Sequence, residues 1–336
     1  MKPVKILVIG ACGQIGTELT RALRLRYGSN NVIAADRFFR STDDGLYRQL
    51  DVLNIDALTH LIREEHITQI YLLAAMLSAS SEQHIHTAWE LNMNGLLNVL
   101  KVAASQKLDK VFWPSSIAVF GPGSPKHLCP QEPTTEPNTV YGISKRAGEY
   151  WCQYYFDKYG LDVRSLRYPG LISYSSPPGG GTTDYAVDIF YQAVEKGHYT
   201  CFLQEDACLP MMYMPDAVRA AIELMEAPAE QIKIRTSYNL SALSFSPCDL
   251  AAAIQKYIPA LEVTYQPDSR QAIASSWPAS VNDQCARTDW AWQSRFDLNM
   301  MVRDMLKNLK HKKKATEAAQ IWLNDDNCVF TRIDEA

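Results

Sequence analysis

Val4-Lys-Ile-Leu-Val-Ile-Gly10-Ala-Cys-Gly13-Gln-Ile-Gly16 is the stretch that decides the fold of this 336-residue chain. Its branched apolar residues, from Val4 to Ile9, are typical of a strand that is buried on both faces. The strand ends at a glycine, and apolar residues at helical spacing follow from Thr17 onward. A strand, a glycine loop and a helix in this order point free backbone N–H groups at a phosphate.

The three glycines have separate roles in this interpretation. Gly10 permits the tight turn, Gly13 lets the backbone approach a pyrophosphate, and Gly16 lets the helix pack closely on the strand. Their spacing is GxxGxxG, and Gln14 and Ile15 lie between the last two. The alternative is a glycine turn without a ligand, and the next strand helps to decide between the two.

A carboxylate ends that next strand, which we expect at residues 31–36. Asp36 lies about 20 residues beyond Gly16, where a carboxylate can accept hydrogen bonds from the ribose hydroxyls of an adenosine. It would repel a 2′-phosphate, and this favours NAD over NADP. Arg37 and Arg40 argue for NADP, because a guanidinium can hold that phosphate. We therefore expect NAD as the cofactor, with Asp36 and Arg37 beside its ribose.

Composition and the cysteine pattern exclude several classes of protein. Hydrophobic residues make up 47% and charged residues 21% of the chain, and the formal net charge is −4. The chain has no excess of basic residues that would indicate nucleic-acid binding. It also has no apolar run that is long enough to cross a bilayer. The eight cysteines form no CxxC pair and no metal-type cluster. The first strand leaves no room for a signal peptide, so we expect a cytoplasmic protein without a metal, or a mitochondrial-matrix protein if a signal is unrecognised.

Strands and helices alternate through the first half of the chain. After the first strand we expect further strands at residues 31–36, near 50–52, and at 69–75, 110–116 and 162–168. This alternation predicts an α/β protein with one parallel, doubly wound, Rossmann-like sheet. We expect an NAD-binding domain at 1–172 with returns at about 212–242, an interleaved smaller substrate-binding domain at 173–211 and 243–310, and a C-terminal tail at 311–336.

Ligands bind at the carboxyl edge of such a sheet. We expect Asp51 to meet the amino group of adenine and Val52 to contact its ring. Ala74 and Ala75 are small and would let a cofactor lie close above the end of their strand. Asn92 interrupts the apolar pattern of a helix that we expect at 86–105, and it is either a buried polar tie or a surface residue.

Tyr141 and Lys145 carry the chemistry in this interpretation. They are four positions apart on a predicted helix at 141–158, so they share a face. A phenol ionises near pH 10, but a nearby ammonium and a positive nicotinamide ring favour the phenolate, which can act as a general base. Lowering that pKa by about three units requires about 4 kcal/mol. Ser115 or Ser116 would hydrogen-bond the reacting oxygen, and only one can face it because a strand alternates its faces.

The order of glycine loop, Asp36, serine-ending strand and YxxxK resembles the extended short-chain dehydrogenase/reductase family over residues 4 to about 310. Long stretches also resemble one branch of it, the short-chain type of L-threonine 3-dehydrogenase: 73–79, 112–121, 141–145, 167–172, 179–186 and 276–278. The resemblance implies NAD-dependent oxidation of the β-hydroxyl of L-threonine to L-2-amino-3-oxobutyrate. It also implies cofactor contacts by Tyr141, by Lys145 and by a further set: Leu73, Asn92, Tyr168, Gly170 and Leu171.

An amino-acid substrate needs partners for a carboxylate, an ammonium and a hydroxyl. Thr182 and Thr183, with the glycine loop at 179–181 before them, are the predicted carboxylate site. Asp184 is the predicted countercharge for the ammonium, and Ser78 is another polar contact. We expect the glycine loop to become ordered when substrate binds, because closure excludes water from hydride transfer.

Two other functions remain open. A nucleotide-sugar epimerase or dehydratase of the same family needs cations or amides for a diphosphate, but the stretch 209–216 carries no basic residue and Pro169-Gly170 stands in place of the usual asparagine. A non-catalytic NAD sensor would have lost Tyr141 or Lys145. The helices expected at 86–105 and 141–158 each carry more apolar residues than one buried face can hold. We therefore expect a homodimer in which these helices form the contact.

Overall fold

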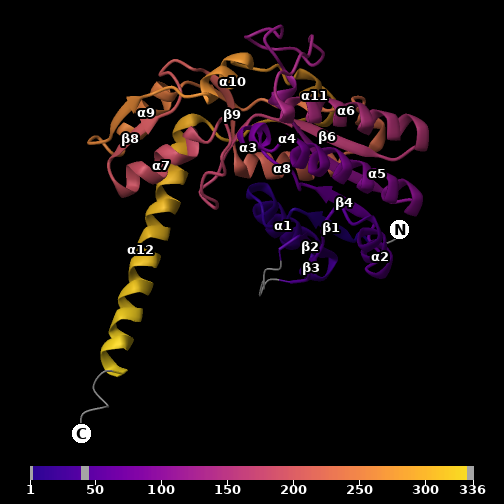
Figure 1. Cartoon of the computed structure of the whole chain (residues 1–336), viewed down its shortest axis with the longest axis horizontal. Coiled ribbons are helices and arrows are strands. Elements are labelled where there is room, and N and C mark those ends of the chain that lie inside the picture. Colours follow the sequence, from indigo (N-terminus) through magenta and orange to yellow (C-terminus); the bar gives the residue numbers. More distant parts are fainter. Residues whose placement is uncertain (1–2, 39–44, 331–336) are drawn as a thin grey trace.

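The computed structural model describes residues 3–38 and 45–330. Its largest element is a seven-stranded sheet in the order β3-β2-β1-β4-β5-β6-β10, in which all neighbouring strands are parallel. The strand order reverses between β1 and β4, as in a doubly wound sheet. The expected Rossmann-like α/β fold is confirmed (Figure 1). The strands are β1 (Ile6–Ile9), β2 (Val32–Asp36), β3 (Tyr47–Gln49), β4 (Gln69–Leu72), β5 (Lys110–Ser116), β6 (Val163–Tyr168) and β10 (Tyr238–Asn239).

Helices cover both faces of this sheet (Figure 1). They are α1 (Gln14–Tyr27), α2 (Ile55–Glu64), α5 (Gly95–Gln106), α6 (Val140–Tyr159) and α8 (Met214–Glu226). The side chains of β1 alternate between the faces. Ile6 and Val8 pack in a core with α1 and α8, whereas Leu7 and Ile9 pack in a core with α2, α5 and α6. The unbroken apolar run of β1 is therefore explained by burial on both of its faces.

The helix expected at 86–105 is interrupted. It comprises α4 (Ile85–Trp89), a π-helical turn (Glu90–Asn94) and α5, and it follows α3 (Ser78–Gln83). Asn92 lies in the π-helical turn and is buried. Its Oδ1 accepts a hydrogen bond from Met76 N at 2.8 Å, and its Nδ2 donates to Met76 O at 3.2 Å and to Ser144 Oγ at 3.4 Å. Asn92 is thus a buried polar tie between the segment after β4 and helix α6.

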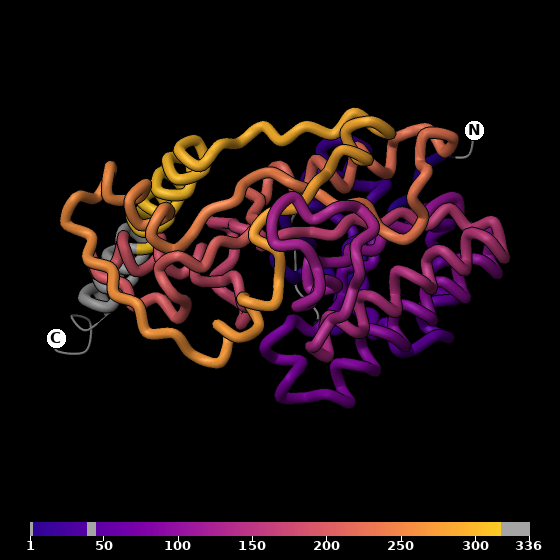
Figure 2. The backbone as a smooth tube through the Cα atoms, turned by 90° about the horizontal axis from the view of Figure 1, so that it is seen from above, coloured from indigo at the N-terminus to yellow at the C-terminus, as the bar shows by residue number. Residues whose placement is uncertain are grey.

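The later part of the chain forms a second, smaller unit beside the main sheet (Figure 2). It has a mixed sheet in the order β11-β9-β7 and a parallel pair, β12-β8. Helix α8 and strand β10 return to the main sheet, while the domain limits remain a prediction. The elements of the smaller unit are β7 (Gly170–Ile172), α7 (Tyr185–Glu195), β8 (His198–Cys201), β9 (Leu209–Tyr213), β11 (Leu243–Phe245), α9 (Pro247–Gln255), β12 (Glu262–Tyr265) and α10 (Arg270–Ser276). Helix α11 (Gln284–Trp290) packs instead with α8 and β10 in a core of the main sheet.

The last helix is longer than the sequence pattern indicated. We expected a C-terminal tail at 311–336, but α12 runs from Leu298 to Phe330 and projects from the body of the molecule (Figure 1). Lys312 in this extension contacts the body of the molecule, because its Nζ donates hydrogen bonds to Tyr174 O at 2.7 Å and to Ser175 O at 3.1 Å. Within 3–38 and 45–330, no helix combines the length and the apolar character that a membrane crossing requires.

Candidate active site

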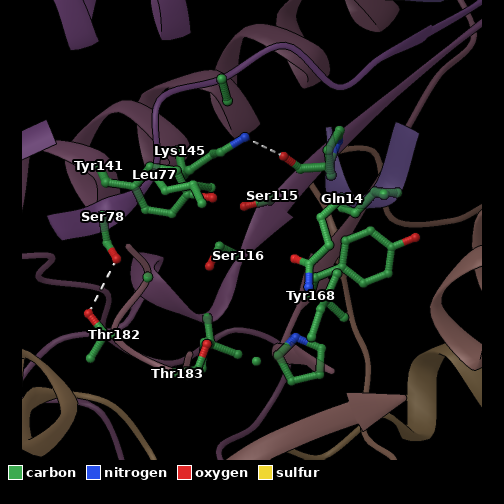
Figure 3. A pocket seen from close by; sticks show the side chains of 18 of the residues that line it. Gln14, Leu77, Ser78, Ser115, Ser116, Tyr141, Lys145, Tyr168, Thr182 and Thr183 are labelled. Carbon is green, nitrogen blue, oxygen red and sulfur yellow. Dashed lines mark hydrogen bonds between the residues drawn. The ribbon is translucent and has the colours of Figure 1, made fainter. Parts of the chain in front are cut away.

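A cavity of about 160 Å³ lies at the carboxyl edge of the main sheet, beside the ends of β5 and β6. Segments far apart in the sequence meet there (Figure 3). Many of the predicted site residues line it: Gln14, Ile15, Leu73, Ala75, Ser78, Ser115, Ser116, Tyr141, Lys145, Tyr168, Gly170, Leu171, Thr182, Thr183 and Asp184. The predicted residues outside its wall are Gly10, Gly13, Gly16, Asp36, Arg37, Asp51, Val52, Ala74 and Asn92.

Several lining residues had no assigned role in the sequence analysis. They are Leu77, Pro114, Ile117, Pro169 and Trp277. Most are apolar or backbone neighbours of predicted residues, so their position follows from those neighbours. Trp277 is different, because it comes from a segment about 90 residues beyond Asp184. Its one signal was the stretch Ser276-Trp-Pro278, which carried the family resemblance without indicating a role.

Tyr141 stands in the first turn of α6, which begins at a capped N-terminus. The Thr139 side chain accepts a hydrogen bond from Gly142 N at 3.0 Å and so satisfies one of the free N–H groups of that turn. Burial raises the pKa of the Tyr141 phenol to about 12, while a hydrogen bond with Ser116 acts in the opposite direction. Ser116 Oγ also accepts from Ala118 N at 3.2 Å, which leaves its own proton for the phenol oxygen.

Ser115 is directed to a different partner. Its Oγ donates to Glu149 Oε1 at 2.7 Å. Glu149 is fully buried and also accepts from Arg167 Nε at 2.7 Å, from Arg167 Nη2 at 2.8 Å and from Arg146 Nη1 at 2.7 Å. The hydroxyl proton of Ser115 is therefore used in the hydrogen bond to Glu149, and only the lone pairs of its oxygen are available to a ligand in the cavity. The two serines, which the sequence left equivalent, differ in this way in their hydrogen bonding.

Lys145 lies on the same face of α6 as Tyr141, as the spacing indicated (Figure 3). Its Nζ donates to Pro114 O at 2.6 Å, lies 4.5 Å from the centroid of a Trp113 ring and lies 5.5 Å from the centroid of the Tyr141 ring. Burial lowers the pKa of Lys145 to about 7, against the opposing effects of Cys152 and Glu149. In the protein alone, desolvation of the ammonium therefore outweighs the attraction that Cys152 and Glu149 exert on it.

The glycine loop has the shape that a dinucleotide pyrophosphate requires. A Cβ on Gly10 would lie 2.5 Å from Ala74 N, and a Cβ on Gly16 would lie 2.1 Å from Gly10 O. At Gly13 the nearest atom, Gly10 O, would be 3.4 Å away, so space remains above this residue. No side chain caps the N-terminus of α1, which leaves its first N–H groups pointing at that space.

Asp36 also fits the expected cofactor. Its Oδ2 accepts from Cys12 N at 3.0 Å and its Oδ1 accepts from Arg37 N at 2.8 Å. Each carboxylate oxygen has further lone pairs, so the group can still accept from two ribose hydroxyls. Arg40, the second argument for NADP, lies outside the described residues.

Three more residues that we predicted to contact the cofactor, Asp51, Val52 and Asn92, have neighbours within the protein. Asp51 is exposed and its Oδ1 accepts from Leu53 N at 2.9 Å. Val52 is buried in the core below the sheet edge. Asn92 was predicted to touch the cofactor, but the groups on its amide are Met76 and Ser144, and it lies outside the cavity wall. Its amide thus ties Met76 to Ser144, and its contact with the cofactor stays a prediction.

The loop at 179–184 corrects one expectation. We expected the N–H groups of its glycines to receive a substrate carboxylate. Asp184 Oδ2 already accepts from them: from Gly179 N at 2.7 Å and from Gly180 N and Gly181 N at 2.8 Å each. The reason is the sharp turn at Gly180, which has φ +91° and points the three groups inward. Ser78 Oγ and Thr182 Oγ1 are 3.3 Å apart and hydrogen-bond one another (Figure 3).

Comparisons with known proteins agree with this geometry. The model of the NAD dependent epimerase/dehydratase family matches residues 6–241. An uncharacterised epimerase/dehydratase of Staphylococcus aureus is 45% identical over 313 residues, which are 92% of this chain and 97% of that protein. A GalE-like L-threonine dehydrogenase from Cupriavidus necator, solved in its holo form, is 54% identical with a TM-score of 0.90, over 91% of this chain and 99% of that one.

A monomeric L-threonine 3-dehydrogenase from a metagenome, solved in its apo form, is also similar. It is 45% identical with a TM-score of 0.89, over 91% of this chain and 99% of that one. Both solved structures are therefore covered almost completely, while about a tenth of this chain lies outside the match.

Proposed function

Because this chain belongs to the NAD dependent epimerase/dehydratase family, we propose that it oxidises the β-hydroxyl of L-threonine with NAD and produces L-2-amino-3-oxobutyrate. The observation that carries the proposal is its 54% identity, over nearly the full length, to a protein described as an L-threonine dehydrogenase. The cavity agrees with it, since Tyr141, Ser116 and Lys145 meet there beside a loop shaped for a dinucleotide.

The proposed chemistry moves one proton and one hydride. Bound NAD supplies the acceptor for the hydride that leaves Cβ. Tyr141, as phenolate, takes the proton of the alcohol oxygen, so that a carbon–oxygen double bond forms as the Cβ–H and O–H bonds break. Ser116 donates a hydrogen bond to the phenol oxygen and stabilises its anion. Lys145, when protonated, adds a positive charge on the same face of α6.

The pKa values show how much the bound cofactor has to contribute. With the pKa of Tyr141 at about 12, bringing it near 7 requires about 7 kcal/mol of preferential stabilisation of the phenolate. The sequence argument required about 4 kcal/mol, because it started from an exposed phenol. The additional requirement comes from burial, and an oxidised, positively charged nicotinamide beside the ring is the group that can meet it in a desolvated cavity.

The polar groups of the cavity suit a free amino acid. Ser78, Thr182 and Thr183 bring hydroxyls to its wall, and Asp184 brings a carboxylate that can balance an ammonium. Among the lining residues, Lys145 is the one cation. A nucleotide-sugar substrate would place two phosphate charges in the site, and these need several cations or amides. The charge of the wall therefore favours the amino acid over the epimerase or dehydratase alternative.

We also propose that two copies associate through the helices expected at 86–105 and 141–158, which correspond to the segment from α4 to α5 and to α6. Large apolar side chains on these helices are exposed: Trp89 by 43%, Ile143 by 47%, Trp151 by 38% and Tyr154 by 45%. Such a patch is unusual on a surface that stays in water. The metagenome relative described as monomeric shows that the same fold also exists as single chains, so the oligomeric state needs its own measurement.

The proposed function is tested by NADH formation from NAD and L-threonine. We expect NADH absorbance to grow with L-threonine, and growth only with a nucleotide sugar would overturn the proposal. Tyr141→Phe should lower kcat by about a hundredfold or more, the range of general-base catalysis, with little change in the dissociation constant of NAD. Tyr155→Phe removes a hydroxyl from the same helix about four turns away, and it should remain active.

A further inference from the structure

One buried polar atom in the cavity wall has no hydrogen-bond partner among the residues that the structure describes. The indole Nε1 of Trp277 is buried and makes no hydrogen bond within the part of the chain that the structure describes. The residue is 5% exposed and lines the cavity with Tyr141 and Thr183. An indole N–H can only donate, and a buried donor without an acceptor destabilises a protein enough to require an explanation.

Loose packing does not explain it, because the rest of Trp277 is held firmly. Its backbone N–H donates to Ala274 O at 3.1 Å, and its carbonyl accepts from Lys126 Nζ at 3.0 Å. The following segment is fixed as well, since Ala279 N donates to Lys126 O at 2.7 Å. The ring itself belongs to the apolar core of the smaller unit. The indole is thus a rigid donor at the wall of the cavity.

Several other donors near the cavity already have partners. The three glycine N–H groups of the loop are bound to Asp184. Lys145 Nζ donates to Pro114 O, and the hydroxyls of Ser78 and Thr182 hydrogen-bond one another. A substrate carboxylate therefore meets in this wall a rigid donor without a partner, the indole of Trp277, beside hydroxyls such as that of Thr183.

We infer that Trp277 Nε1 donates a hydrogen bond to the carboxylate of an amino-acid substrate. This inference rests on the proposed function, because L-threonine carries a carboxylate that a simple secondary alcohol lacks. A carboxylate is a strong acceptor, and a hydrogen bond to it is shorter and stronger than one to a neutral group. Trp277 would thus select amino acids over alcohols that lack the acid.

The chain contains a matched control for this inference. Trp290, on α11, also has a buried indole Nε1 without a partner in the described part of the chain. It packs against the rings of Tyr238 and Trp292, with centroid distances of 6.1 Å and 5.7 Å, and it does not line the cavity. Trp290→Phe also removes a buried, unpartnered indole N–H, but at a position that does not line the cavity.

The test compares two substrates in two variants. L-Threoninol keeps the hydroxyl and the ammonium of L-threonine and replaces the carboxylate by a neutral alcohol. For Trp277→Phe we expect kcat/KM for L-threonine to fall by about ten- to a hundredfold, the range for a lost hydrogen bond to a charged group. With L-threoninol the same variant should differ from the wild type by less than about threefold, and Trp290→Phe should leave both substrates unchanged.

Equal losses with both substrates would show that Trp277 acts through packing and would overturn the inference, as would unchanged kcat/KM for L-threonine. If Trp277→Phe does not fold, the indole N–H signals of the ¹⁵N-labelled wild type with NADH decide. One of the seven tryptophans should shift with L-threonine and stay in place with L-threoninol, and no such shift would refute the inference. A wild type that binds L-threonine in this way without oxidising it would instead contradict the proposed function.

Discussion

Glu149→Gln is the substitution that most directly tests the architecture behind the cavity. The Glu149 carboxylate is fully buried and accepts four hydrogen bonds, two from Arg167, one from Arg146 and one from Ser115, at 2.7 to 2.8 Å. Glutamine keeps the shape of the side chain but removes its charge. Its NH₂ group replaces one acceptor oxygen and faces guanidinium donors, so the buried Arg167 loses its counterion.

The expected loss follows from the burial of the pair. Breaking a buried ion pair by neutralising one partner destabilises a protein by about 3–5 kcal/mol, since the remaining charge is left uncompensated. At about 2–4 °C per kcal/mol for a chain of this size, the Tm should fall by roughly 6–20 °C. The control is Glu223→Gln, because Glu223 pairs with Arg219 but is 33% exposed. A solvent-screened pair of this kind contributes less than about 1 kcal/mol.

Thermal unfolding of the two variants and the wild type, followed by circular dichroism, measures the difference. Urea unfolding at one temperature gives the free energy of unfolding directly. The reasoning is refuted if Glu149→Gln unfolds within about 1 kcal/mol of the wild type, or if Glu223→Gln loses as much stability as Glu149→Gln. Either result would mean that burial does not set the strength of this ion pair.

Three further predictions concern the cofactor loop, the base and the subunit contact. Gly16→Ala should lower the Tm by several degrees, because its Cβ would overlap Gly10 O, whereas Gly13→Ala should unfold like the wild type and bind NAD more weakly; equal Tm values for both variants would contradict this. At saturating NAD, kcat/KM for L-threonine should rise by up to about tenfold per pH unit below about pH 7 and level off above about pH 8, since the proposed mechanism requires bound NAD to lower the pKa of Tyr141 from about 12 to near 7; a flat profile from about pH 5 to about pH 9 would count against this base. Analytical ultracentrifugation should show dimers of the wild type and monomers of Trp151→Glu, and a monomeric wild type would remove the proposed interface.

The fold was predictable because its signals are local. An unbroken apolar strand, a glycine turn and a helix follow one another within the first 27 residues, and the same alternation recurs as far as β6. The mixed sheet β11-β9-β7 was not foreseen, since its strands have three to five residues and are too short for a periodic pattern. The length of α12 was also missed, because we interpreted residues 311–336, whose apolar periodicity is weak, as a C-terminal tail.

The candidate site was predictable in part. Residues that follow buried strands or sit at helical spacing could be placed at one edge of the sheet, and the cavity brings most of them together. Asn92 was assigned to the cofactor, yet it ties Met76 to α6. Asp184 was assigned to the substrate ammonium, yet it also holds the glycine loop closed through three N–H groups. In each case a short polar side chain accepts hydrogen bonds from backbone N–H groups, and only the folded loop brings those groups within reach.

The sequence by itself determined the sheet, the phosphate loop, the carboxylate at Asp36 and the helix that carries Tyr141 and Lys145, since each depends on neighbours within about one element. Only the tertiary structure decided which serine meets the phenol, how burial moves the pKa values of Tyr141 and Lys145 in opposite directions, and that the indole of Trp277 reaches the cavity. These properties depend on desolvation and on hydrogen bonds between residues far apart in the chain. They arise when separate elements pack together and exclude water.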